Sequence, residues 1–276
     1  MLFHDRDFST LLIDEAADKP DRVHIQLNRP EVRNAIDQQM VDELHQVCAV
    51  LEQTPRILIL SGSGGVFASG ADIAQLRERR RDDALMGINS GIFVRIAKLP
   101  MPVIAALDGY ALGGGAELAY AADFRIGTPA LKIGNPETGL GILAAAGASW
   151  RLRELVGEPV AKEILLAGKV LGAEEARAVH LITGIHPAEE LLAAAHGLAD
   201  RIGLQDPLAV RITKSVFHAP PEAHPVIDQL AQGILFESQA KFDRMQAFLD
   251  KRASKQAAKD ARSTGAQETM QQEAAK

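Results

Sequence analysis

Two glutamates lie where a charged side chain is difficult to accommodate. Glu117 is surrounded by Ala, Gly and Leu, and Glu137 follows Asn135-Pro136 between apolar segments. Burying an unpaired carboxylate is costly, so acidic residues in apolar surroundings are candidates for proton transfer. The alternative for each is a helix N-terminal or surface position. We take Glu117 and Glu137 as a candidate acid/base pair.

Two glycine-containing turns are candidates for binding a negatively charged oxygen. One covers residues 67–72, and the other covers residues 109–115 and ends in three successive glycines. Each follows a predicted strand and opens a predicted helix, where backbone N–H groups lack helical acceptors and benefit from the helix dipole. Two such turns that converge can hold one oxyanion. The alternative is that the glycines only permit tight turns, but the nearby Glu117 favours the catalytic interpretation.

Several common catalytic and cofactor motifs are missing from the sequence. No Ser stands at the centre of Gly-x-Ser-x-Gly, and no two of the eight histidines are spaced His-x-x-x-His. The glycine-rich stretches match neither the dinucleotide pattern Gly-x-Gly-x-x-Gly nor the phosphate-loop pattern Gly-x-x-x-x-Gly-Lys-Ser/Thr. We therefore expect a reaction that needs no metal and no bound cofactor.

The composition is that of a globular protein without a nucleic-acid or membrane partner. The 276 residues are 47% hydrophobic and 24% charged, and the net charge of −6 comes without a basic stripe. The longest weakly charged segment, 99–124, is interrupted by prolines, glycines and Glu117, which excludes a membrane span. The N-terminus lacks a secretory pattern, and the single Cys48 cannot form an intrachain disulfide. We expect a soluble, cytoplasmic protein.

Strands and helices alternate in the first half of the sequence. Period-2 alternation over 23–27 predicts a half-buried strand paired with 10–14, and the apolar runs 57–60 and 103–107 predict buried strands. Asp37 can cap a helix with an apolar face. Further predicted elements are a helix over 83–98, a helix opened by the glycines at 113–115, and extended segments at 124–126 and 131–133.

The second half is mainly helical, with a long helical stretch expected over 222–249. Strands first and helices last predict an α/β core with a helical C-terminal part. We assign the site to a core over residues 1–145, and oligomerisation and pocket closure to residues 146–250. Residues 251–276 contain one large apolar side chain, Met270, and are predicted to be a disordered tail.

From about residue 10 to about residue 252, the sequence resembles the crotonase superfamily, and its enoyl-CoA hydratases in particular. The matching blocks, in order, are Asn28-Arg29-Pro30 with Asn34-Ala35, Phe67-Ala68-Ser69-Gly70-Ala71-Asp72-Ile73, Pro102-Val103-Ile104-Ala105-Ala106 leading to Gly109-Tyr110-Ala111-Leu112-Gly113-Gly114-Gly115-Ala116-Glu117-Leu118, and Gly134-Asn135-Pro136-Glu137 before Leu140-Gly141. The ordered combination of these blocks is highly specific.

This resemblance implies a crotonase-like spiral of ββα units that acts on an acyl-CoA thioester and assembles as a homotrimer or homohexamer. In the family pattern, the N–H groups of Ala71 and Gly114 hold the thioester oxygen, and Glu117 and Glu137 are the two glutamates of a hydratase. The stretch from Ala68 to Ala74, which includes Ala71, Asp72 and Ile73, is expected to line the coenzyme A site together with Gly114.

The leading hypothesis is hydration of a trans-2-enoyl-CoA to a 3-hydroxyacyl-CoA, with Glu117 activating water and Glu137 protonating C2. One alternative is an enoyl-CoA double-bond isomerase that uses mainly Glu137. Another is a non-catalytic CoA- or RNA-binding interaction protein. The presence of both glutamates favours the hydratase over the isomerase, and the net negative charge argues against RNA.

The sequence departs from the family pattern where relatives form the acyl pocket. After Leu140-Gly141 it lacks the frequent Pro-Gly-x-Gly-Gly-Thr-Gln-Arg-Leu and has a different segment, including residues 144–150. This departure leaves the acyl specificity open. Arg33 and the mixed-charge run 77–83 are candidate contacts for the phosphates of coenzyme A, with a solvated surface as the alternative.

Overall fold

The computed structural model describes the backbone of residues 2–274 and the side chains through residue 256. The chain divides into two compact units, residues 1–215 and 216–276, and each is described by itself. Within residues 2–274, no helix combines the length and the apolar character needed to cross a bilayer. The division predicted at residue 145 falls inside the first unit. Oligomerisation and pocket closure by residues 146–250 stay predictions.

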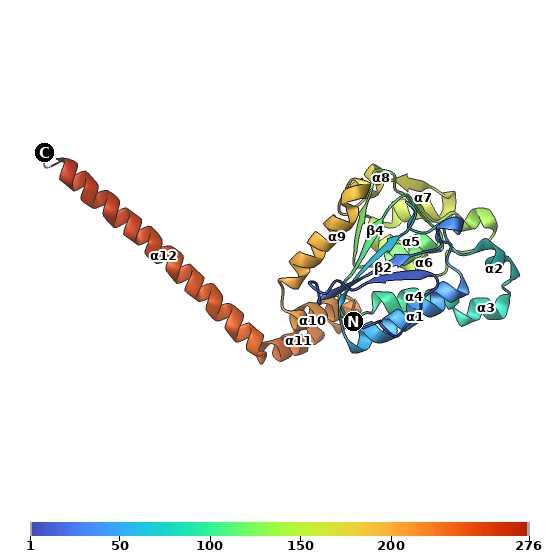
Figure 1. Ribbon diagram of the computed structural model, residues 1–276, viewed down its shortest axis with the longest axis horizontal. Coiled ribbons are helices and arrows are strands. Elements are labelled where there is room, and N and C mark those ends of the chain that lie inside the picture. Colours follow the sequence, from blue (N-terminus) through green and yellow to red (C-terminus); the bar gives the residue numbers. More distant parts are fainter. Residues whose placement is uncertain (1, 275–276) are drawn as a thin grey trace. The chain divides into compact units, whose positions relative to one another are not determined.

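A five-stranded sheet forms the centre of the first unit (Figure 1). Its first strand is antiparallel to the second, as expected for the 10–14 and 23–27 pair, and the other neighbours are parallel. In sheet order, the strands are β1 (Leu11–Asp14), β2 (Arg22–Leu27), β3 (Ile57–Gly62), β4 (Val103–Leu107) and β6 (Phe124–Gly127).

Both faces of this sheet are buried, which explains the uninterrupted apolar runs in β3 and β4. Leu58 and Leu60 point into the larger core, with α1 (Gln38–Gln53) and α4 (Ile88–Ala97). Ile57 and Ile59 point to the opposite face, which α9 (Ala188–Gly203) covers with Leu191, Ala195 and Ala199. The α1 N-terminus is capped as predicted, because Met40 N–H donates to Asp37 Oδ1 over 2.8 Å.

A second, three-stranded sheet positions the two glutamates. It consists of β5 (Tyr110–Leu112), β7 (Lys132–Gly134) and β8 (Val170–Gly172), and β5 runs parallel to its neighbour β7. Helix α5 (Gly114–Tyr120) starts directly after β5, and the short 3-10 helix η2 (Pro136–Leu140) starts directly after β7. Since the carboxyl ends of parallel neighbours meet at one edge of a sheet, Glu117 in α5 and Glu137 in η2 are brought to the same place.

The structure corrects two of the predicted helices. The helix expected over 83–98 is two helices, α3 (Arg81–Met86) and α4, because Gly87 between them has φ 63°, a left-handed conformation that interrupts a helix. The stretch expected over 222–249 is likewise divided into α11 (Val226–Phe236) and α12 (Gln239–Ala274). The short helix α2 (Ile73–Glu78) follows the first glycine turn, where a helix was expected without predicted bounds.

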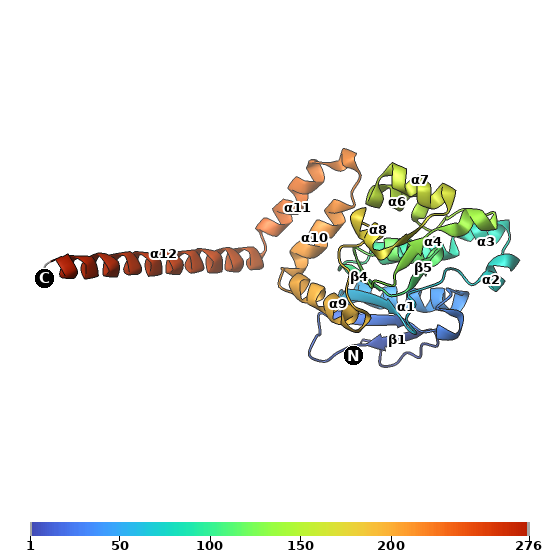
Figure 2. The same ribbon diagram turned by 90° about the horizontal axis from the view of Figure 1, so that it is seen from above.

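The remaining helices of the first unit agree with the prediction that the second half of the sequence is mainly helical. They are α6 (Ala148–Val156), α7 (Glu158–Ala167), α8 (Ala173–Ala178) and α10 (Pro207–Phe217), whose last two residues fall in the second unit. Helices α6 and α7 lie next to each other (Figure 2).

The second unit contains α11 and α12. The backbone of α12 is helical to Ala274, whereas residues 251–276 were predicted to be a disordered tail. Side chains 251–256 are exposed, and those from 257 onward lie outside the described residues.

Candidate active site

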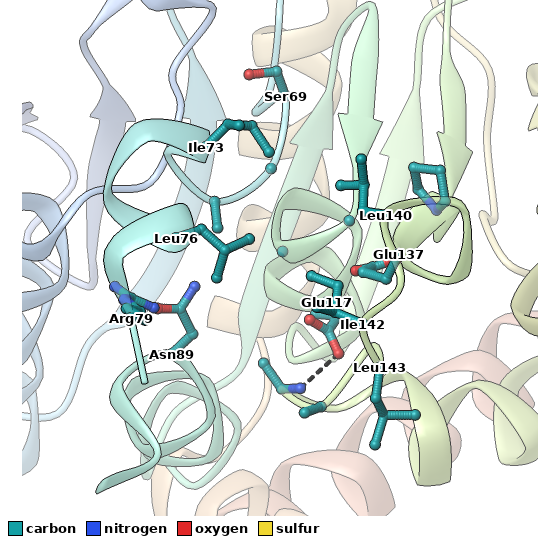
Figure 3. A pocket seen from close by; sticks show the side chains of 17 residues that line it. Ser69, Ile73, Leu76, Arg79, Asn89, Glu117, Glu137, Leu140, Ile142 and Leu143 are labelled. Carbon is teal, nitrogen blue, oxygen red and sulfur yellow. Dashed lines mark hydrogen bonds between the residues drawn. The ribbon is translucent and has the colours of Figure 1, made fainter. Parts of the chain in front are cut away.

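One pocket of the first unit brings together residues from both glycine turns and both glutamates (Figure 3). Its walls come from α2, the start of α4, the start of α5, η2 and the segment after η2. The lining residues are Ser69, Gly70, Ala71, Ile73, Leu76, Arg79, Asn89, Gly113, Gly114, Glu117, Pro136, Glu137, Leu140, Ile142, Leu143, Ala145 and Ala146. Across residues 2–256, no group of three or more His, Cys, Asp and Glu side chains is arranged to hold a metal ion.

The backbone N–H groups of Ala71 and Gly114 are neighbours in this pocket. A Cβ added to Gly114 would lie 3.4 Å from the Ala71 nitrogen. Neither N–H donates to a protein acceptor in the described part of the chain. The turns that present them need glycine, since Gly70 has φ 122° and Gly113 has φ 52°. The arrangement can hold one oxygen atom between two donors, as an oxyanion hole does.

Close packing between the two turns depends on Gly115. A Cβ at this position would lie 2.3 Å from the carbonyl oxygen of Ala68, so α5 can approach the first turn only with glycine here. Ala68 is fully buried, its N–H donates to the Tyr110 carbonyl, and its carbonyl accepts from Leu112 N–H. The first turn is thereby tied to β5, which fixes Ala71 relative to Gly114.

Glu117 is held by the backbone of the segment that precedes α6. Glu117 is only 4% exposed and lies in the pocket shown in Figure 3. Its Oε1 accepts hydrogen bonds from Ala146 N–H at 2.7 Å and from Ala148 N–H at 3.1 Å. Burial raises the pKa of Glu117 to about 7; the charge of Glu137 acts in the same direction, and the backbone donors act against it. Such a carboxyl group can exchange a proton near neutral pH.

One carboxylate oxygen of Glu137 is hydrogen-bonded within the described structure, and the other is not. Oε1 accepts from Asn135 Nδ2 at 3.3 Å, and Asn135 Oδ1 in turn accepts from the Tyr120 hydroxyl at 3.0 Å. Oε2 is buried and has no hydrogen-bond partner in the described structure. Burial raises the pKa of Glu137, and the hydrogen bond from Asn135 only partly opposes this. Burial therefore makes Glu137 easier to protonate than an exposed glutamate, and Oε2 is available to a bound molecule.

The predicted site residues fall into two groups. Ala71, Ile73, Gly114, Glu117 and Glu137 line the pocket. Ala68, Asp72 and Ala74 lie beside it in the chain without lining it, and their contact with substrate stays a prediction.

Asp72 has a structural role in this region. It caps α2 by accepting from Ala74 N–H and Gln75 N–H, and it lies 3.4 Å from Arg29 Nη1. The other candidate for a phosphate contact, Arg33, is exposed and has φ 54°.

Sequence reasoning missed Asn89, Leu76 and Leu140, whereas the segment after Gly141, which the resemblance places at the acyl pocket, contributes Ile142, Leu143, Ala145 and Ala146 to the lining. It treated Arg79 only as part of a charged run, whereas its Nη1 donates to Asn89 Oδ1 at 3.2 Å inside the pocket lining. The turn at Gly87, which starts α4 just before Asn89, was the signal that could have found this pair.

Comparison with known proteins agrees with this geometry. The family model for enoyl-CoA hydratase/isomerase matches residues 22–259. The chain is 36% identical over 235 residues to the crotonyl-CoA hydratase of Syntrophomonas wolfei, covering 82% of this chain and 90% of the relative. It is 32% identical over 239 residues to the short-chain-enoyl-CoA hydratase of Clostridium acetobutylicum, covering 83% of this chain and 91% of the relative.

The fold agrees as well. The crystal structure of an enoyl-CoA hydratase from Bacillus anthracis superimposes with a TM-score of 0.83 at 29% identity, covering 88% of this chain and 97% of that chain. The expected α/β, crotonase-like fold is thereby confirmed. The chain belongs to the enoyl-CoA hydratase/isomerase family of the crotonase superfamily.

Proposed function

We propose that this protein hydrates trans-2-enoyl-CoA thioesters to 3-hydroxyacyl-CoA thioesters. The observation that supports this most directly is that two buried glutamates line the same pocket as the two unpaired N–H groups of Ala71 and Gly114. Hydration of an activated double bond needs one group that accepts a proton, one that donates a proton, and a site for the developing negative charge.

The two N–H groups would hold the thioester oxygen. Hydrogen bonds to this oxygen withdraw electron density from C3 and stabilise the enolate-like transition state. One such donor is worth about 2.7–4 kcal/mol in comparable oxyanion sites. C3 thereby becomes the electrophilic carbon that water attacks.

The glutamates would complete the addition on the same face. The oxygen of water forms a bond to C3 while its proton passes to Glu117, which the amides of Ala146 and Ala148 hold in place. The C2–C3 π electrons form the bond from C2 to a proton donated by Glu137. Proton exchange with solvent afterwards restores the starting forms of both side chains.

The electrostatics of the pocket favour protonation of this pair, and the assignment of the proton to Glu137 rests on the resemblance to enoyl-CoA hydratases. The reaction starts with one carboxylate and one carboxylic acid. Burial raises the pKa of both side chains, and the charge of Glu137 adds to the rise at Glu117. Both shifts favour the protonated forms, and a proton held by one glutamate makes ionisation of the other easier, as in other interacting carboxyl pairs.

The deciding assay uses crotonyl-CoA and the isomeric 3-butenoyl-CoA. A hydratase removes the enoyl absorbance of crotonyl-CoA and forms 3-hydroxybutyryl-CoA. An isomerase leaves crotonyl-CoA unhydrated and converts 3-butenoyl-CoA to the conjugated isomer. Binding of CoA thioesters without turnover of either compound would support a non-catalytic binding protein and contradict the proposal.

A further inference from the structure

Arg79 is the only basic residue among the described residues that line the pocket, and the proposed hydration does not use it. It follows the last turn of α2, and its side chain is half-buried. The wall around it is made largely of apolar and small residues. A guanidinium group in such surroundings is suited to bind a planar anionic group, because it stays charged and keeps its N–H donors in one plane.

The guanidinium of Arg79 has one neutral partner in the described part of the chain. Nη1 donates to Asn89 Oδ1 at 3.2 Å, and no carboxylate there pairs with it. Two other arginines of this region are paired with carboxylates, since Arg95 lies 2.7 Å from Glu52 and Arg81 lies 3.3 Å from Asp82. A guanidinium has five N–H donors. Most of those of Arg79 therefore remain available to a molecule that enters the pocket.

Asn89 places this cation beside the acyl group. A Cβ added to Gly114 would lie 3.6 Å from Asn89 Nδ2, so the Arg79–Asn89 pair adjoins the proposed oxyanion site. Figure 3 shows Ser69 and Ile73 at one end of the pocket and Arg79 near the other, across from Glu117 and Glu137. Since the segment containing Ser69 and Ile73 is expected to hold coenzyme A, Arg79 lies on the side where the acyl chain would extend.

We propose that Arg79 binds a carboxylate at the far end of the acyl chain, so that the preferred substrate is a short 2-enoyl-CoA carrying a terminal carboxylate. This inference rests on the proposed function and narrows its substrate class. The planar fork of a guanidinium matches the two oxygens of a carboxylate. The anionic group would lie on the wall of Arg79, away from Glu117 and Glu137, because like charges repel in a partly desolvated pocket.

The test compares two substrates with the same five-carbon chain. One is the mono-CoA thioester of trans-2-pentenedioic acid, and the other is trans-2-pentenoyl-CoA, which has a methyl group in place of the carboxylate. We expect kcat/KM of the wild-type protein to be at least about 10-fold higher for the carboxylated substrate, since a hydrogen-bonded charge pair contributes this much or more.

Variants of Arg79 should change the ratio of these two kcat/KM values. Arg79→Gln is expected to lower the ratio about 10- to 100-fold. Arg79→Lys should give an intermediate ratio, because it keeps the charge and loses the fork. The matched control is Arg77→Gln on the same helix, an exposed residue outside the pocket lining, which should leave the ratio unchanged.

Two outcomes would overturn the inference while leaving the hydratase intact. One is an unchanged ratio in Arg79→Gln. The other is an equal rise in KM for both substrates, which would place Arg79 on coenzyme A. If neither compound is hydrated, the proposed function fails, and the dissociation constants of the saturated glutaryl-CoA and pentanoyl-CoA still test Arg79. If the wild type binds glutaryl-CoA more tightly than pentanoyl-CoA and Arg79→Gln does not, the carboxylate site is supported. Equal binding of the two compounds by the wild type would reject it.

Discussion

Glu117 and Glu137 are assigned different proton transfers, so each amide variant should block one of them. Glu117→Gln and Glu137→Gln keep the side-chain volume and hydrogen bonding but remove the titratable group. Each is expected to lower kcat for crotonyl-CoA hydration by roughly 10²–10⁴, the usual contribution of general acid/base catalysis. Initial rates at saturating substrate measure this.

The double variant and the isomerase assay serve as controls for that expectation. The double variant should lose much less than the product of the two single losses, because both residues act in one step. An isomerase would lose activity in Glu137→Gln and tolerate Glu117→Gln. Undiminished hydration by a correctly folded Glu137→Gln protein would leave Glu137 as a structural carboxylate beside Pro136.

The raised pKa of Glu117 also predicts a pH-dependent cost to stability. The ordinary value is 4.5 and the value in the folded protein is about 7, so between these pH values the folded state binds more protons than the unfolded state. Raising the pH through this window therefore lowers the free energy of unfolding, by up to about 3 kcal/mol. Glu117→Gln should match the wild type near pH 5 and exceed its stability near pH 8.

Urea unfolding at both pH values, at one protein concentration, measures this difference. Equal stabilities of the two proteins at pH 5 and at pH 8 would show that the pKa of Glu117 is close to its ordinary value. The same experiment on Arg77→Gln controls for the loss of an exposed charge.

At the scale of the elements, Gly115 controls how closely α5 approaches the first glycine turn. Gly115→Ala places a Cβ against the Ala68 carbonyl and must displace backbone, at a cost of about 1–3 kcal/mol. Because this displacement separates Ala71 from Gly114, kcat should fall together with the unfolding midpoint.

Gly91 provides a matched control for this prediction. It lies inside α4, and a Cβ there meets nothing within 4 Å, so Gly91→Ala should stabilise the protein by roughly 0.5–1 kcal/mol. Measured by thermal or urea unfolding, an equal effect of the two substitutions would show that the approach of α5 to the first turn is looser than the structure indicates.

Elements that are determined by a local pattern of residues could be predicted from the sequence. The apolar runs of β3 and β4 and the Asp37 cap of α1 are local signals, and the structure confirms them. The pair of glutamates was found because carboxylates are unusual among Ala and Gly residues. Arg79 was not resolved within its charged run, because its contact with Asn89 of α4 is created by the fold and leaves no mark on the residue pattern of α2.

At the scale of the whole molecule, the helices of the second unit carry many exposed apolar side chains. On α11 these include Val226, Leu230 and Ile234, which recur at helical spacing and are 59–68% exposed. On α12 they include Phe242 and Phe248. Exposed apolar surface of this extent marks an interaction site.

This surface is consistent with association of several copies, and the resemblance to the crotonase superfamily implies a homotrimer or a homohexamer. Light scattering at micromolar concentration should give three or six times the chain mass of 29.6 kDa. A particle of 29.6 kDa would contradict this.

Removing residues 253–276 should have little effect. Residues 253–256 are exposed, and the rest of this segment offers one large apolar side chain, Met270. Changes at such positions usually alter stability by less than about 0.5 kcal/mol. The truncated protein should keep its unfolding temperature and its rate with crotonyl-CoA. A large loss of thermal stability would show that the segment packs against the rest of the protein.

The way in which Glu117 is held has a consequence for how this protein can evolve. The segment that forms one wall of the pocket with Ile142, Leu143 and Ala145 also supplies the amides of Ala146 and Ala148 to the carboxylate. Every residue except proline carries such an amide. Point mutations can therefore reshape the wall and change the accepted substrate while the carboxylate keeps its position. Insertions or deletions in this segment would shift the amides. The substrate range can therefore change here through substitutions of side chains, but not through changes in the length of the segment.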